Sequence, residues 1–86
     1  MPTISRFYGI VIRMWFDDHP VPHFHAEYGE YSAKVSIASG AILNGYLPPR
    51  IRRMVRYWAR VHTLELVENW GRLSLHLQPR PIEPLP

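Results

Sequence analysis

The sequence predicts an α+β domain: a three- or four-stranded antiparallel meander followed by one kinked or two C-terminal helices packed on one face of the sheet. Two observations carry this prediction. Apolar and polar residues alternate through much of residues 7–44, in runs separated by glycine-containing turns, which is typical of antiparallel strands. From residue 49 onward apolar residues recur at helical spacing instead. All predicted strands precede the helices, so the βαβ alternation of a parallel sheet is absent.

The first strand is predicted at residues 7–16, with one face formed by Ile10, Ile12, Met14 and Phe16. The next six residues hold two prolines and two aspartates and are predicted to form a loop, because proline cannot donate to a strand ladder. Residues 22–28 predict the second strand. Its side chains alternate between an apolar face (Phe24, Ala26, Tyr28) and a polar face (His23, His25, Glu27).

A two-residue turn at Gly29-Glu30 fixes the register of the next strand, since glycine suits the first position of a type II′ turn. The register places apolar residues opposite one another and polar residues opposite polar ones along the whole hairpin. The expected pairs are Tyr28 with Tyr31, Ala26 with Ala33, Phe24 with Val35, Glu27 with Ser32, His25 with Lys34, and His23 with Ser36.

A short further strand is predicted at residues 41–44, with turns at Ser39-Gly40 and Asn44-Gly45. A helix begins at Leu47-Pro48-Pro49, because proline is tolerated in the first helical turn. The apolar stripe shifts after His62, which predicts a break at His62-Thr63 and a second helix, capped by Thr63, to about His76. We expect one domain at residues 1–77 and a proline-rich tail without regular structure at residues 78–86.

Length and composition restrict the class of protein. Eighty-six residues, 47% of them apolar, suffice for one hydrophobic core and one domain. There is no cysteine, so disulfides and thiolate metal sites are excluded and any metal site must use histidine and carboxylate ligands. The N-terminal residues form no apolar signal core, and no apolar run reaches membrane-spanning length, so we expect a cytoplasmic protein with no membrane partner.

Charge is segregated along the chain, although the net charge is only +3. Residues 17–30 carry four acids and no Lys or Arg, whereas residues 31–64 carry one Lys, five Arg and no acid. Nine of the ten cations are arginine, whose planar fork binds the two oxygens of a carboxylate or phosphate at once. The arginines of the first helix form its outer face, which predicts either a solvated surface or a site for nucleic acid or an acidic protein partner; they are Arg50, Arg52, Arg53, Arg56 and Arg60.

The candidate reactive residues lie between Asp17 and Tyr28. His23 and His25 leave the same face of a strand, with Cα atoms about 7 Å apart, a separation that permits chelation of a divalent metal ion. His19 from the loop, and Glu27 or Asp17 as a carboxylate, are the candidates for completing such a site. The alternative interpretation is a polar sheet face turned to solvent.

Metal-independent acid–base chemistry is the second hypothesis. His19, His23, His25 and Glu27 are the residue types that a small nuclease-like hydrolase uses as acid and base, because the ordinary pKa of histidine suits both roles near neutrality. Arginines would then stabilise the charge that develops on a phosphate. This hypothesis requires the histidine strand and the arginine helix to meet in space. No phosphate-binding glycine loop and no Ser-His-Asp pattern is present.

Several segments resemble one small bacterial family, catalogued as domain of unknown function four-one-six-zero. The resemblance covers nearly the whole chain and is most specific in the run from His19 to Tyr28, His-Pro-Val-Pro-His-Phe-His-Ala-Glu-Tyr, where Val21 replaces an expected proline. The other matching segments are Pro2-Thr3-Ile4, Gly9-Ile10, Trp58-Ala59, Glu68-Asn69-Trp70 and Ile82-Glu83-Pro84-Leu85.

The resemblance implies one half of a two-protein, toxin–antitoxin-like module, because members of the family are often encoded beside a second small protein. We therefore expect a small protein partner and RNA or DNA as a further ligand, with the His/Glu strand as the candidate active surface. A noncatalytic interaction or regulatory module, including a homodimer formed through an exposed strand edge, is the alternative. A His-ligated metal-binding domain is the second alternative.

Overall fold

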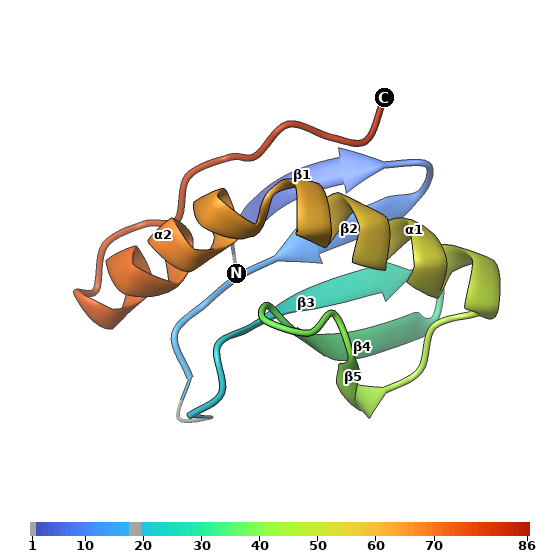
Figure 1. The fold of residues 1–86 in the computed structure, drawn as a ribbon, viewed down its shortest axis with the longest axis horizontal. Coiled ribbons are helices and arrows are strands. Elements are labelled where there is room, and N and C mark those ends of the chain that lie inside the picture. The colour runs from blue at the N-terminus through green and yellow to red at the C-terminus, as the bar shows by residue number, and fades with distance from the viewer. Residues whose placement is uncertain (1, 18–19) are drawn as a thin grey trace.

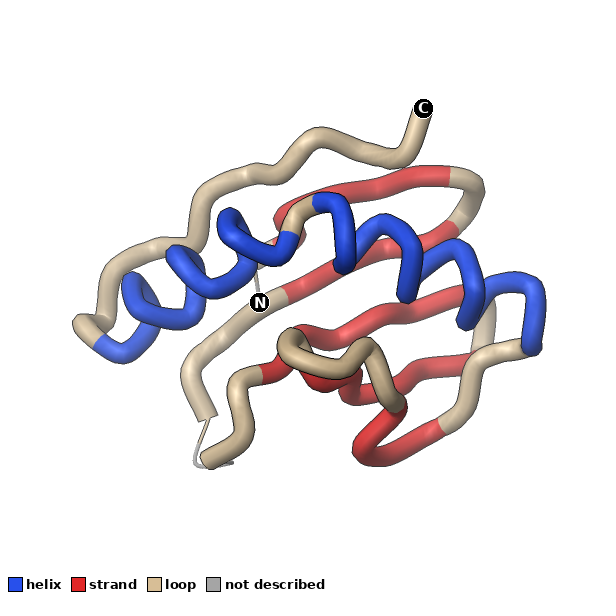
Figure 2. Tube along the Cα trace, in the orientation of Figure 1, coloured by secondary structure: helices blue, strands red, loops and turns tan. Residues whose placement is uncertain are grey.

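Five antiparallel strands form one sheet, and two helices cover one of its faces in the computed structural model, which describes residues 2–17 and 20–86 (Figures 1 and 2). The strands lie in the sheet in the order in which they occur in the chain, so each is joined to its neighbour by a turn or loop. The elements are β1 (Thr3–Phe7), β2 (Ile10–Arg13), β3 (His23–Tyr28), β4 (Tyr31–Ser36), β5 (Ile42–Gly45), α1 (Pro49–Val61) and α2 (Thr63–Ser74). The predicted α+β meander is confirmed.

The sheet has one strand more than predicted, because the chain turns back at Tyr8-Gly9. Residues 7–16 are not a single strand: β1 and β2 form a hairpin in which Phe7 pairs with Ile10. Tyr8 and Gly9 both have positive φ, 51° and 81°, the conformation that a tight hairpin turn requires. The predicted inner face of β2 is correct for Ile10, Ile12 and Met14, which are buried; Phe16 lies beyond the strand and is 53% exposed.

The β3–β4 hairpin has the register that the sequence predicts. All six expected pairs are present, from Tyr28 with Tyr31 at the turn to His23 with Ser36 at the far end. Phe24 and Ala26 are completely buried beneath the helices, and the Phe24 ring meets Trp58 of α1 at a centroid distance of 5.8 Å. His25 and Glu27 therefore project from the opposite face of the sheet.

The helix α1 begins at Pro49, inside the predicted first turn, and packs its apolar side on the sheet. Its buried residues are Ile51, Val55, Trp58 and Ala59. Val61 follows the apolar spacing of this helix but is 58% exposed, because the helix ends there and the chain changes direction. The break at His62-Thr63 is confirmed. Thr63 does not cap α2: its hydroxyl donates to the carbonyl oxygen of Ala59, at 2.9 Å, in the preceding helix.

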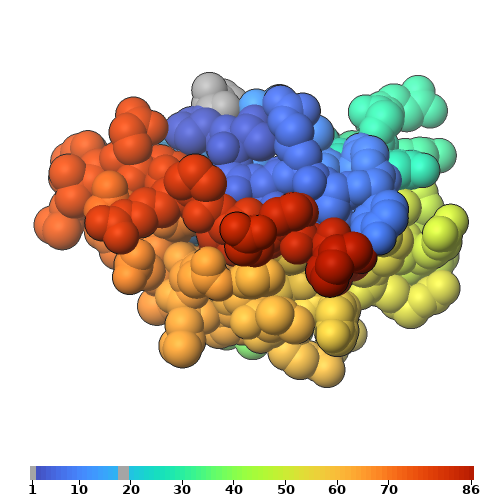
Figure 3. All heavy atoms as spheres, turned by 90° about the horizontal axis from the view of Figure 1, so that it is seen from above, coloured from blue at the N-terminus to red at the C-terminus, as the bar shows by residue number. Residues whose placement is uncertain are grey.

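The segment after α2 has no regular secondary structure, and it packs along the molecule. In Figures 1 and 3 it runs beside β1 and the helices. Asn69, which is buried in α2, holds it with two hydrogen bonds to the backbone of Arg80: Nδ2 donates to the carbonyl oxygen and Oδ1 accepts from the N–H. Ile82 is buried, and its N–H donates to the Ile4 carbonyl oxygen of β1 at 2.7 Å. The tail therefore covers part of the outer edge of β1.

No helix in the described part of the chain is both long enough and apolar enough to span a membrane.

Candidate functional site

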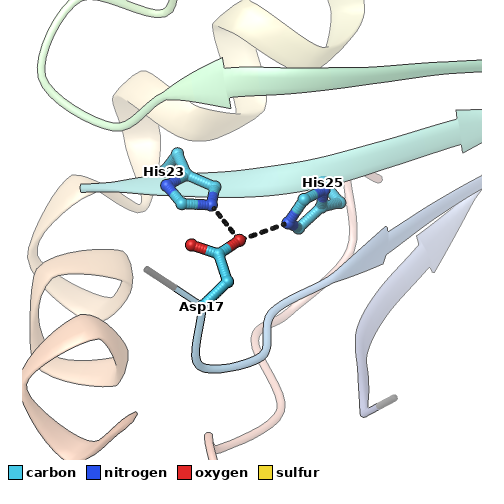
Figure 4. A group of neighbouring side chains, drawn as sticks. All are labelled: Asp17, His23 and His25. Atoms are coloured by element: carbon cyan, nitrogen blue, oxygen red, sulfur yellow. Dashed lines mark hydrogen bonds and ion pairs between the residues drawn. The ribbon is translucent and has the colours of Figure 1, made fainter. Parts of the chain in front are cut away.

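Asp17, His23 and His25 converge where the loop after β2 returns to the start of β3 (Figure 4). The two histidines leave β3 on the same side because they are two residues apart in a strand. Asp17 comes from the loop and turns its carboxylate between the two rings. One nitrogen from each ring and one carboxylate oxygen all lie within 4.8 Å of one another.

His23 sits between two oxygen atoms, one on each side of its ring. Nδ1 lies 2.7 Å from the carbonyl oxygen of Val21, which can only accept a hydrogen bond, so Nδ1 carries a proton. In a neutral ring Nε2 then carries the lone pair. Nε2 lies 3.0 Å from Asp17 Oδ2, and two lone pairs at that distance repel each other unless a positive charge lies between them. Either a proton shared between Nε2 and the carboxylate or a metal ion supplies that charge.

His25 differs from His23 because its ring is held by stacking. The indole of Trp15 lies parallel to it at a centroid distance of 3.5 Å. His25 Nε2 is buried and has no hydrogen-bond partner among the described residues; its nearest carboxylate oxygen, Asp17 Oδ2, is 3.7 Å away. Burial, the nearby His23 ring and Lys34 lower the pKa of His25 from 6.5 to about 4, although Asp17 acts in the opposite direction. His25 therefore presents an available lone pair at neutral pH.

These three groups have the chemistry and the spacing of a metal-binding site. Donor atoms bound at 2.0–2.1 Å to a tetrahedral ion lie about 3.3 Å apart, and the two separations from Asp17 Oδ2, 3.0 and 3.7 Å, are close to that value. The hydrogen bond from His23 Nδ1 to a backbone carbonyl is the outer contact that orients most metal-binding histidines. Small side-chain movements would therefore bring all three donors to one ion.

Glu27 lies on the same sheet face as His25 but pairs with another residue. Its two carboxylate oxygens both lie 3.2 Å from Nε of Arg13, because the β2–β3 register places Arg13 diagonally opposite. Glu27 and His25 nevertheless share a surface hollow of about 280 Å³, which Trp15, Lys34 and Asn44 also line. The strand therefore offers a metal-type cluster at one end and a small polar hollow along its outer face.

Among the described residues, the remaining candidates lie apart from this cluster. His19 lies outside the described residues. The five arginines of α1 are exposed on the side of the helix that faces away from the sheet. Because α1 covers the sheet face opposite His25 and Glu27, the structure does not bring the arginines and these residues together. A nuclease-like site that combines both sets is not assembled.

Asp17 and Trp15 are the site residues that the sequence indicates only weakly. Asp17 is one of two acids in the predicted loop, and only the path of that loop brings it between the histidines. The alternation of residues 7–16 predicts Trp15 on the outer side of a strand, but it does not identify the partner of Trp15 there. An aspartate six residues before an alternating histidine pair is the one available signal.

Comparison with known proteins places the chain in a family. No curated protein and no solved structure matches the chain significantly. A family model described as Domain of unknown function (DUF4160) matches residues 9–71, a range that holds β2 to β5, α1, most of α2 and the three clustered side chains. The match covers well over half of the 86 residues. The chain therefore belongs to the family Domain of unknown function (DUF4160).

Proposed function

We propose that this protein binds a divalent transition-metal ion through Asp17 Oδ2, His23 Nε2 and His25 Nε2. The observation that carries the proposal is the pairing of His23 with Asp17. Because His23 Nδ1 already donates to a carbonyl, Nε2 and the carboxylate face each other across 3.0 Å and need a shared positive charge. The buried Nε2 of His25, which has no hydrogen-bond partner among the described residues and lies 3.7 Å from Asp17 Oδ2, points to a metal ion rather than a single proton, since an ion can serve all three donors.

The ligand set favours zinc and its neighbours over calcium or magnesium. Imidazole nitrogens suit Zn²⁺, Cu²⁺, Ni²⁺ and Fe²⁺, whereas Ca²⁺ and Mg²⁺ prefer oxygen ligands. Three protein ligands leave one position for water or a substrate, as in catalytic rather than structural zinc sites. Asp17 and His25 are partly exposed, with 25% and 15% of their side-chain surface accessible, so solvent reaches the cluster.

The proposal is tested by titrating metal-stripped protein with zinc chloride in a calorimeter. We expect one ion per chain and a rise in melting temperature on binding, because a ligand that binds only the folded state stabilises it. His23→Gln, His25→Gln and Asp17→Asn should each weaken binding at least about tenfold, the effect expected of losing one of three ligands.

His62→Gln is the matched control. Nδ1 of His62 lies 2.6 Å from Glu65 Oε1, so this histidine also faces a carboxylate, but the described residues include no second histidine beside that pair. Zinc binding should survive His62→Gln unchanged. A wild-type protein that binds no zinc, or three site variants that bind it as tightly as wild type, would contradict the proposal and leave the cluster as a hydrogen-bonded His23–Asp17 pair.

We further propose, as the second candidate, the two-protein module that the family resemblance implies. The unpaired arginines of α1, in the part of the chain that the structure describes, support a partner or nucleic-acid surface separate from the histidine cluster. The His23→Ala/His25→Ala double variant separates the two roles. Loss of growth inhibition or RNA cleavage in a variant that still folds supports chemistry at the cluster, and unchanged behaviour supports a module that only binds.

A further inference from the structure

The first helix carries an unusual amount of uncompensated positive charge. Within the part of the chain that the structure describes, none of its five arginines lies within ion-pair distance of a carboxylate. The sequence itself explains this, since residues 31–64 contain no acid. Guanidinium groups held close together without counter-charges repel one another, and an anionic ligand relieves that repulsion.

Three of these arginines form one wall of a groove. Arg52, Arg53 and Arg56 line a space of about 510 Å³ whose other wall is Gly40, Ala41 and Ile42, at the start of β5. Gly40 has a φ of +74°, and a Cβ atom there would lie 2.9 Å from Cγ of Arg56, so the turn approaches this arginine more closely than another residue would permit. A smaller hollow that shares Gly40 and Arg56 extends the groove to Arg60.

In the wall opposite the arginines, Ile42 is the first residue of the edge strand β5, whereas Gly40 and Ala41 belong to the preceding turn, where their N–H groups donate to the Ser36 carbonyl oxygen and to Ser39 Oγ. β5 is the last strand in the sheet order and pairs only with β4 among the described strands, so the backbone groups on its other side are available (Figure 1). The opposite edge, β1, is partly covered by the tail through the Ile82–Ile4 hydrogen bond. A groove between an edge strand and a helix is the arrangement in which extended peptides add to a sheet.

The lining of the groove favours a peptide over nucleic acid. Among the described residues no aromatic side chain lines it, whereas single-stranded nucleic acid is held largely by stacking of bases on aromatic rings. A strand edge also offers N–H and C=O groups in alternation, which a peptide backbone satisfies and a sugar–phosphate backbone does not. The arginine wall in turn selects carboxylates.

We propose that the groove between β5 and α1 binds an acidic segment of a partner protein in extended conformation, as a sixth strand paired with β5. Alternate side chains of that segment point toward α1, so glutamates or aspartates at every second position meet Arg52, Arg53 and Arg56. This site lies apart from the histidine cluster and does not require a metal ion.

Fluorescence anisotropy with a labelled eight-residue peptide of alternating glutamate and valine tests the proposal. Arg52→Gln/Arg56→Gln should weaken binding at least about tenfold, since two charge-assisted pairs are lost while the aliphatic stem beside Gly40 remains. Arg6→Gln/Arg80→Gln is the matched control: it removes the same charge from exposed side chains away from the groove and should change the affinity less than about twofold. The same peptide with N-methylated alternate residues should bind much more weakly, because it cannot pair as a strand.

Three results would overturn this proposal. Equal losses of peptide affinity in both double variants would show that binding depends only on the net charge of the protein. Undiminished binding of the N-methylated peptide would exclude strand addition. An RNA dodecamer that binds more tightly than the peptide, displaces it, and loses affinity in Arg52→Gln/Arg56→Gln would assign the surface to nucleic acid. Asp17→Asn should bind the peptide like wild type, so failure of the metal proposal and failure of this one are distinguishable.

Discussion

His23 and His25 are two positions apart in one strand and meet opposite surroundings. Each ring nitrogen of His23 faces an oxygen atom: Nδ1 faces the Val21 carbonyl oxygen, and Nε2 faces Asp17 Oδ2. His25 is covered by an aromatic ring and leaves a buried nitrogen without a partner among the described residues. The difference arises because the loop that precedes β3 folds back over one ring and Trp15 over the other.

We expect the metal-free protein to lose stability as the pH falls from about 6.5 to about 4. The pKa of His25 is near 6.5 in the unfolded chain and lowered to about 4 in the folded protein by burial, His23 and Lys34. Between these values the unfolded state binds more protons, so the free energy of unfolding decreases as the pH decreases through this range. Below about pH 4 both states are protonated at His25 and this contribution is fully lost.

Urea unfolding in the presence of a chelator, at several pH values between about 4 and about 7.5, measures this effect. His25→Gln should show a shallower decrease than the wild type over the same range, because the titrating group is absent. The carboxylates titrate in both proteins. The difference between the two plots of unfolding free energy against pH therefore gives the contribution of His25 alone. Parallel slopes would show that His25 does not contribute.

The sequence predicts part of the candidate site and not the rest, for a reason visible at single residues. Alternation along a strand is a local property, so the common direction of His23, His25 and Glu27 follows from the pattern. The partner of each residue depends on tertiary structure: Glu27 meets Arg13 through the β2–β3 register, and Asp17 reaches the histidines through the path of a loop. No spacing rule specifies that path.

At the scale of elements, the turns decide what can be predicted. Gly29-Glu30 is a recognisable two-residue hairpin turn, so the whole β3–β4 register follows from it and is correct. The turn at Tyr8-Gly9 is hidden in the sequence because a tyrosine rarely adopts positive φ, and the prediction of a single strand at residues 7–16 is therefore wrong. The helix break is predictable because the apolar stripe changes phase at His62, whereas the hydrogen bond that Thr63 makes depends on side-chain geometry.

Two glycine substitutions should act in opposite directions. Gly45 ends β5 with a φ of +90°, and a Cβ atom there would lie 2.2 Å from the Ser32 carbonyl oxygen, so Gly45→Ala should destabilise the protein by about 2–4 kcal/mol. Gly71 lies inside α2, and a Cβ atom there would meet nothing within 4 Å, so Gly71→Ala should stabilise the protein by about 0.5–1 kcal/mol. Chemical denaturation measures both changes. A Gly45→Ala variant as stable as wild type would show that the β4–β5 contact is loose.

At the scale of the whole molecule, the C-terminal tail joins the helices to the sheet. It makes two hydrogen bonds with Asn69, its Glu83 carbonyl oxygen accepts from Nε1 of the buried Trp58, and Ile82 enters the core. The prolines of the sequence indicate an irregular segment, but irregular structure does not imply a free one. The tail itself lies outside residues 9–71, the range that the family model matches.

Asn69→Ala should lower the free energy of unfolding by about 2 kcal/mol, because two partly buried hydrogen bonds are lost and the Arg80 carbonyl and N–H lose their partners. Amide hydrogen exchange gives a more specific readout. The Arg80 N–H should exchange much faster in the variant. Amides of the β3–β4 hairpin should lose only the protection that corresponds to the lower free energy of global unfolding. Exchange at Arg80 that matches wild type would contradict this role of Asn69.

The hydrogen bond from Ile82 to Ile4 also limits how copies of this molecule can associate. A sheet with two uncovered edge strands can pair with another molecule at each edge. Repeated pairing of this kind extends into fibrils. Here residues around Ile82 cover part of one edge, that of β1. Strand pairing through the β1 edge is therefore hindered, and removal of residues 80–86 should make the protein more prone to polymerise.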